Sequence, residues 1–115
     1  MKIIDDHQKI KLEELREMSK NRFGNLVKAV VDIEKGIMAV DAELHADQEA
    51  LLLEQDSEQG NLWGINIYPD IHGKDRIEFD SMINLRPSWG NLSRGVDDIK
   101  IQTKIIEIVS NLIEE

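Results

Sequence analysis

The spacing of apolar residues changes twice along the chain, and this change limits the fold more than any other feature. Near both ends, apolar residues recur at the spacing of an amphipathic helix, over residues 12–23 and 99–113. Between these regions they alternate with polar residues, which is typical of strands with one buried face. The sequence therefore predicts an α+β fold, with an N-terminal and a C-terminal helix on one face of a single antiparallel sheet of four or five strands.

The middle of the chain contains several strand-like segments separated by turn residues. At Gly36 the apolar residues change from odd to even positions, which indicates either a hairpin turn or one long bulged strand over residues 27–45. We favour the hairpin. The strands are predicted over residues 2–5, 27–33, 38–44, 63–68 and 77–85, and the last has the clearest alternation.

The two helices have recognisable ends. Gly24 is a plausible stop for the first helix, and Asp97 or Asp98 is the expected N-cap of the second. The apolar stripe of the second helix is unusually broad, which suggests burial against a further surface besides the sheet. We therefore expect a homodimer. The stripe consists of Ile101, Ile105, Ile106, Ile108, Val109, Leu112 and Ile113.

Length and composition narrow the class of protein. A chain of 115 residues is expected to form one domain over residues 1–115, and the absence of cysteine excludes a disulfide scaffold and a thiolate metal site. No apolar run reaches the roughly 20 residues of a membrane span. Asp5 and Asp6 stand where a signal peptide would have its apolar stretch. These features predict a cytoplasmic protein that does not associate with membranes.

Negative charge is concentrated in the middle of the chain. The net charge is −9, and no Lys or Arg lies between Gly36 and Gly73. Binding to nucleic acid requires a basic face, so we expect no nucleic-acid partner. A basic protein partner or a divalent cation would match this charge better, although a solvated, charged sheet face explains it most simply.

One acidic segment has the spacing of a metal site. If residues 41–49 formed a strand, their carboxylates and one imidazole would stand on one face, and a neighbouring strand would have to complete the site. We expect no cofactor, and prefer to interpret this segment as the hydrated face of a sheet. The candidate ligands for a divalent metal are Glu43, His45, Asp47 and His72.

The polar loop before the last helix is the second candidate site. Its arginines, serines and glycines resemble the parts of an anion site. Trp89 could be a contact point for a partner, although we slightly favour a ring that folds back over the sheet edge. The alternative, which we favour, is a structural connection in which these side chains satisfy turn amides and sheet carboxylates. The candidate residues are Arg86, Ser88, Trp89, Asn91, Ser93 and Arg94.

Three segments resemble a family of short prokaryotic proteins of unknown function. They read KAVVDIEKGIMAVDAELHADQEALLL from Lys28, LWGINIYPD from Leu62 and IEFDSMINLRPSWGNLSRGV from Ile77. The resemblance covers nearly the whole chain. It implies a compact fold and brings no catalytic residues, because the family has no assigned activity.

Two functions remain open at this point. We favour a non-enzymatic binding or assembly module, because folding alone explains most of the features described. The alternative is a small metal-dependent hydrolase, in which Arg86 and Arg94 would orient an anionic substrate at the metal site.

Overall fold

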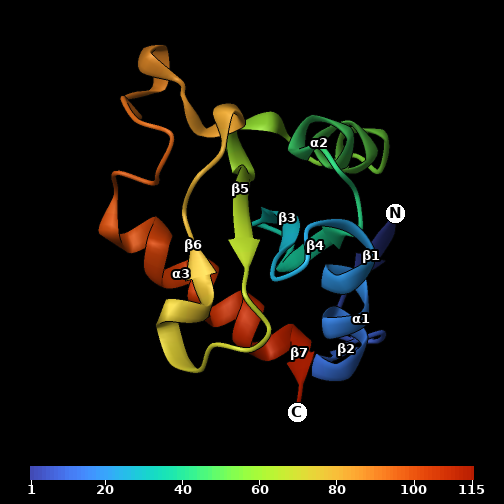
Figure 1. The fold of residues 1–115 in the computed structure, drawn as a ribbon. Coiled ribbons are helices and arrows are strands. Elements are labelled where there is room, and N and C mark those ends of the chain that lie inside the picture. Colours follow the sequence, from blue (N-terminus) through green and yellow to red (C-terminus); the bar gives the residue numbers. More distant parts are fainter.

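The computed structural model describes residues 1–115, and Figure 1 shows its arrangement. Three α-helices and seven short strands alternate along the chain, joined by turns that include four short 3₁₀ segments. In chain order the elements are β1 (Lys2–Ile4), β2 (Ile10–Lys11), α1 (Leu12–Arg22), β3 (Val27–Asp32), β4 (Ile37–Val40), α2 (His45–Glu54), η1 (Gln59–Asn61), β5 (Leu62–Ile67), η2 (Gly73–Arg76), β6 (Ile77–Glu78), η3 (Met82–Asn84), η4 (Pro87–Trp89), α3 (Ile99–Leu112) and β7 (Ile113–Glu114).

Five of the strands form one antiparallel sheet in the order β1-β4-β3-β5-β6. This confirms the predicted α+β fold with one antiparallel sheet and with β1 at its edge. A separate parallel pair, β2 with β7, joins the two ends of the chain through Ile10 opposite Ile113. None of the helices has both the length and the apolar character needed to cross a bilayer.

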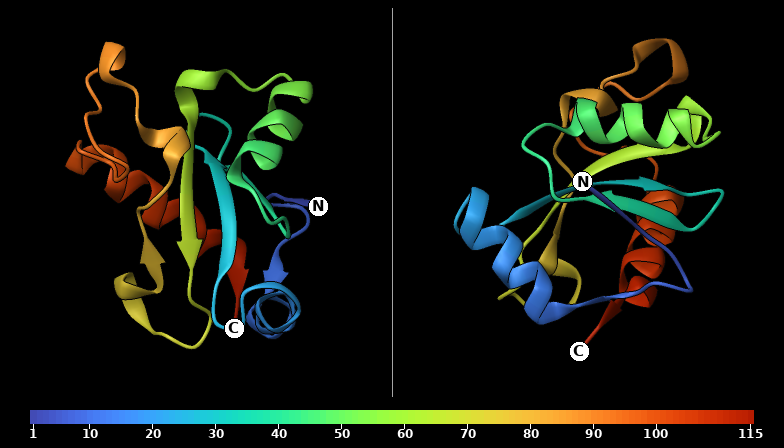
Figure 2. Two further views of the ribbon diagram at one scale, coloured as in Figure 1. Left: turned by 45° about the horizontal axis from the view of Figure 1, so that its top comes forward. Right: turned by 90° about the vertical axis from the view of Figure 1, so that its right-hand side faces the viewer.

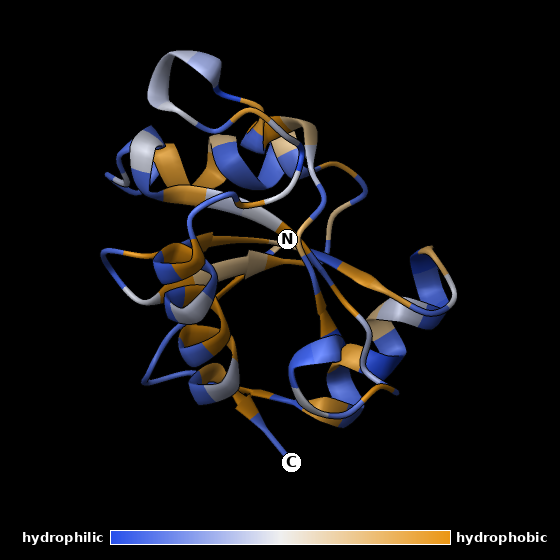
Figure 3. Cartoon of the chain, turned by 90° about the vertical axis from the view of Figure 1, so that its left-hand side faces the viewer, coloured by the Kyte–Doolittle hydropathy of each residue, from blue (hydrophilic) through white to orange (hydrophobic).

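The sheet is covered on both faces, as the right-hand view of Figure 2 shows. Helices α1 and α3 lie on one face, as predicted, and α2 lies on the other. The larger part of the core lies between α1, α3 and the sheet, and includes Leu15, Val31, Met38, Ile65 and Ile105. Because the sheet is covered on both faces, its strands are largely apolar, whereas much of α1 is hydrophilic, as Figure 3 shows.

Residues 27–40 form the hairpin, so the alternative of one long bulged strand is wrong. Asp32 pairs with Ile37 across the hairpin, and Gly36 has the positive φ of +70° that the turn requires. The buried Asp32 carboxylate accepts hydrogen bonds from the amides of Glu34 and Lys35 at 2.9 and 3.0 Å. The Asp32 side chain therefore provides hydrogen-bond acceptors for turn amides that have no partner on a neighbouring strand.

The expectation of strand structure over residues 41–49 is wrong, because β4 ends at Val40 and helix α2 begins at His45. The segment HADQEALLLE consists mostly of good helix formers. It buries His45, Gln48 and Leu52, which recur at helical spacing. The acidic residues fit a period of two by coincidence, whereas the buried residues follow a period near 3.6.

The strand predicted over residues 77–85 is also largely wrong, because β6 contains only Ile77 and Glu78. The segment nevertheless runs along β5, and the side chain of Asn84 takes the place of a strand backbone. Its Oδ1 accepts from the Gly64 amide at 2.8 Å, and its Nδ2 donates to the Gly64 carbonyl at 2.9 Å. The approach is so close that a Cβ at Gly64 would lie 2.6 Å from Ser81 Cβ.

The last helix starts as predicted, with Asp98 as its N-cap, since its side chain accepts from the Lys100 amide at 2.9 Å. The apolar stripe of α3 is mostly used within the chain. Ile105, Ile108, Val109 and Leu112 are buried, and Ile101, Ile106 and Ile113 pack against the same core. The stripe on which the homodimer expectation rests is thus largely covered by the chain's own sheet.

We expect Asn84→Ala to lower the free energy of unfolding by about 2–4 kcal/mol, because it leaves the buried amide and carbonyl of Gly64 without partners. Urea denaturation followed by circular dichroism measures this change. Asn25→Ala is the matched control, because Asn25 is exposed, and it should alter stability by less than about 0.5 kcal/mol. An equal effect of both substitutions would contradict the structural role assigned to Asn84.

Candidate functional site

The loop predicted as a site divides into a structural part and an exposed part. Asn91 belongs to the structural part, since it is 5% exposed and uses both ends of its amide. Its Nδ2 donates to the carbonyls of Asn84, Ser93 and Gly95 at 2.7–3.1 Å. Its Oδ1 accepts from the Asp97 amide at 2.8 Å. Asn91 therefore holds the loop in shape, with both of its amide hydrogens engaged within the chain.

Ser93 and Arg94 are likewise engaged within the chain. Asp97 accepts from the Ser93 hydroxyl at 2.6 Å and from the Leu92 amide at 2.7 Å, and these hydrogen bonds hold the pKa of Asp97 below its ordinary value. Arg94 forms an ion pair with Asp80 at 2.8 Å. The contacts match the structural reading of the loop for these two residues.

The exposed part of the loop is built around Arg86, whose own side chain is buried. Its guanidinium donates to the Leu62 carbonyl at 2.6 Å and lies 3.5 Å from Glu49 Oε2. The same group stacks between two tryptophan rings, 5.0 Å from the centroid of Trp63 and 5.4 Å from that of Trp89. Burial lowers the pKa of Arg86 from its ordinary value, while Glu49 opposes that effect.

Trp89 is the outermost member of this stack and is 58% exposed, whereas Trp63 is 6% exposed. Beside the stack lies a cavity of about 370 Å³. Trp63 and Arg86 line this cavity, and each has one buried donor atom, Trp63 Nε1 and Arg86 Nη1, that has no hydrogen-bond partner in the chain. Asp97 and Asp98 also line the cavity. We call this arrangement the Trp89 pocket.

Ser88 does not line the Trp89 pocket. It is exposed in η4 and borders a shallower hollow with Gln59, Leu85 and Pro87. The loop therefore contributes Arg86, Trp89 and Asn91 to one pocket. Trp63 also lines this pocket, although it belongs to the main core cluster; the alternation over residues 63–68 predicts a strand but gives no signal for a role in a pocket.

The four residues proposed as metal ligands lie apart. Glu43 is exposed and lies 3.8 Å from Arg22, Asp47 is exposed on α2, and His72 is exposed before η2. His45 is buried beneath α2, where its Nε2 lies 2.7 Å from the Ile65 carbonyl oxygen. No group of three or more His, Asp or Glu residues is placed to hold a metal ion. The geometry assumed for the site depended on a strand that the chain does not form.

His45 has an altered acidity because of its location. Burial lowers its pKa from the ordinary value, and the positive charge of Lys28 acts in the same direction. The hydrogen bond to the Ile65 carbonyl opposes the shift, but burial is the larger effect. The ring is therefore neutral at pH 7 and donates through Nε2.

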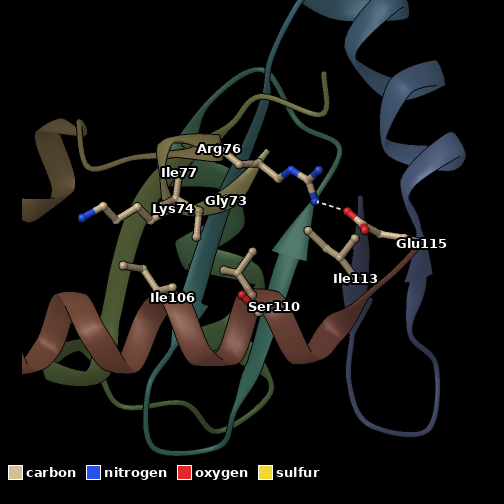
Figure 4. Close-up of a pocket in the computed structure, with 9 residues that line it drawn as sticks. Gly73, Lys74, Arg76, Ile77, Ile106, Ser110, Ile113 and Glu115 are labelled. Carbon is tan, nitrogen blue, oxygen red and sulfur yellow. Dashed lines mark hydrogen bonds and ion pairs between the residues drawn. The ribbon is translucent and has the colours of Figure 1, made fainter. Parts of the chain in front are cut away.

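A separate cavity of about 380 Å³ lies between α3 and the segment that leads into β6, as Figure 4 shows. Ile77, Ile106 and Ile113 form much of its wall. Arg76 crosses one end, donating to the Ile71 carbonyl at 2.6 Å and pairing with Glu115 at 2.9 Å. Through these contacts Arg76 connects Glu115 to the η2 turn.

The pKa of His45 predicts a specific pH dependence of stability. In the unfolded chain the His45 ring takes up a proton near pH 6.5, whereas in the folded chain it does so only at a lower pH. The free energy of unfolding therefore falls as the pH decreases below about 6.5. We expect urea denaturation to show a loss of up to about 1.4 kcal/mol per pH unit between pH 6.5 and 5.5.

In His45→Gln this loss should disappear, because glutamine does not titrate. His72→Gln, in which an exposed histidine is replaced, should retain the behaviour of the wild type. A slope that persists in His45→Gln would show that another group causes it.

Residues 2–112 match the model of a protein family of unknown function, DUF5674, which confirms the resemblance found in the sequence. Neither curated proteins nor solved structures show a significant match to the chain. The match extends over almost all of the chain, so the protein belongs to the DUF5674 family of unknown function.

Proposed function

We propose that this chain is a non-enzymatic binding module that holds an extended, basic segment of a partner protein at the Trp89 pocket. The observation that carries the proposal is the exposed Trp89 ring, stacked on a buried arginine beside two buried donors that have no partner. Tryptophan and arginine are enriched among the few residues that contribute most of the binding energy at protein interfaces.

The unpartnered donors indicate what the ligand must offer. Trp63 Nε1 and Arg86 Nη1 each need an acceptor, and a buried donor without one is costly. Backbone carbonyls of an extended peptide would supply such acceptors at regular intervals. The surrounding segment also exposes large apolar side chains that a peptide could cover, namely Met82, Leu85, Leu92 and Ile99.

The charges around the pocket favour a basic segment. Glu49 already balances Arg86, so Asp97 and Asp98 leave the pocket wall negative. Lysine or arginine side chains of a partner would meet these carboxylates and could stack on the free face of Trp89. The net charge of −9 would attract such a segment from a distance.

No observation favours the alternative of a metal-dependent hydrolase, because its proposed ligands lie apart and its two arginines face different partners. A second copy of the chain is a weaker candidate for the occupant than a basic segment. The apolar stripe of α3 is largely covered, and only Ile99, at the start of the helix, is strongly exposed.

The proposal is tested with two labelled, capped pentapeptides, Gly-Arg-Leu-Arg-Gly and Gly-Glu-Leu-Glu-Gly, in fluorescence anisotropy titrations. We expect only the basic peptide to bind the wild type. Trp89→Ala should weaken binding at least tenfold, since it removes the central contact. Asp98→Asn should weaken it a few-fold while the helix stays capped, because asparagine is also a good N-cap.

Phe23→Ala is the matched control, because Phe23 is also an exposed aromatic residue but lies at the end of α1. It should leave the affinity unchanged. Equal binding of both peptides, or full binding by Trp89→Ala, would refute the proposal. Sedimentation of the wild type as a dimer that Trp89→Ala separates would instead identify a second copy as the occupant.

A further inference from the structure

A second polar cavity, of about 340 Å³, lies on the face of the sheet that α2 covers. It opens between the start of α2, the side chains of Lys28 on β3 and Asn66 on β5, and the segment from Asp80 to Ile83. We propose that this cavity, which we call the His45 cavity, binds a small phosphate monoester that carries a hydroxyl group. This site is separate from the Trp89 pocket and does not depend on the function proposed there.

The lining is positive, although the protein as a whole is strongly negative. Lys28 forms no ion pair with a carboxylate, and its Nζ lies 5.3 Å from the centroid of the Phe23 ring. The charge of Arg94 is balanced by Asp80 at 2.8 Å. The unbalanced charge of Lys28 therefore remains for an anion.

The start of α2 adds to this positive character. The helix has ten residues, and its N-cap is Leu44, whose apolar side chain cannot accept a hydrogen bond from the first turn. Leu44, His45 and Ala46 all line the cavity. An anion there would meet amides that no side chain caps, at the positive end of the helix dipole.

A buried acceptor without a partner indicates that the ligand also carries a donor. Asn66 is 7% exposed, and its Nδ2 donates to Glu78 Oε1 at 2.8 Å, which fixes the orientation of the amide. Its Oδ1 is buried and has no partner in the chain. Because an anion alone would be repelled by this oxygen, the ligand needs a hydroxyl group beside its phosphate.

Two further side chains suit the same ligand. Since the Nε2 of His45 donates to the Ile65 carbonyl, Nδ1 is the acceptor nitrogen of the neutral ring and could receive a second hydroxyl. Ser81 is 2% exposed, and its hydroxyl oxygen accepts from the Ile83 amide at 3.2 Å, so its proton is available to an anion. The volume of the cavity suits a small metabolite.

The test is a set of ¹H–¹⁵N NMR titrations with inorganic phosphate, glycerol 3-phosphate and glycerol, at ionic strength held constant with sodium chloride. We expect saturable shifts of the His45 and Ala46 amides with both phosphates and none with glycerol. Glycerol 3-phosphate should bind roughly three- to tenfold more tightly than phosphate, which corresponds to one additional hydrogen bond.

Substitutions in and outside the cavity locate the site. Lys28→Met should lower the affinity for both phosphates at least tenfold. Lys104→Met, at an exposed lysine on α3, should leave both affinities unchanged. Asn66→Ala should remove the advantage of glycerol 3-phosphate without abolishing phosphate binding. Should Lys28→Met fail to fold, Arg94→Gln is the substitute and should weaken binding as well. Trp89→Ala should bind phosphate like the wild type, which separates this proposal from the peptide site.

Several results would overturn the proposal. Shifts that grow linearly without saturation would show only weak screening of charge. Full affinity in Lys28→Met, or an equal loss in Lys104→Met, would show that the anion binds elsewhere. Equal affinities for the two phosphates would refute the hydroxyl contact with Asn66.

Discussion

The two hydrogen bonds between the Asn84 side chain and the backbone of Gly64 support much of what is distinctive in this structure. They let an irregular segment close the outer edge of β5, where a regular strand would otherwise be needed. A strand would place a side chain on alternate faces along its whole length, whereas the irregular segment is free to turn. Because of that freedom, Ser81 reaches the His45 cavity while Arg86 and Trp89 reach the Trp89 pocket.

The two candidate sites have opposite electrostatic character, although one short segment contributes to both. Glu49 neutralises Arg86, so the carboxylates of Asp97 and Asp98 dominate the Trp89 pocket. In the His45 cavity the ion pair of Arg94 with Asp80 leaves Lys28 unbalanced. The overall charge of a protein is thus a poor guide to the charge that a particular ligand meets.

The sequence predicted the features that depend on periodicity and turn chemistry. The β3–β4 hairpin followed from the change of phase at Gly36, and the ends of α1 and α3 followed from Gly24 and Asp98. The prediction from the sequence was wrong where a period of two and a helical period overlapped. In α2 the acids happened to alternate, and the residues that decide the helix, His45 and Gln48, are polar and give no signal in a hydrophobic pattern.

The failure over residues 77–85 has a different cause. Apolar and polar residues do alternate there, but the segment is joined to β5 by hydrogen bonds of the Asn84 and Arg86 side chains instead of backbone hydrogen bonds between strands. No periodicity distinguishes these arrangements, because the substitution depends on contacts distant in sequence. In the loop, the contacts of Asn91 and Ser93 follow from local turn chemistry, and Arg94 pairs with a carboxylate as the structural interpretation expects.

The parallel pairing of β2 with β7 affects how this chain can acquire its structure during synthesis. Ile10 precedes α1, whereas its partner Ile113 follows α3, so the two residues are separated by almost all of the sequence described here. Closing so long a loop carries a large entropic cost, so the contact forms late. During synthesis, β1 can pair with β4 as soon as residues 38–40 are available, whereas β2 stays unpaired until α3 and Ile113 have been made.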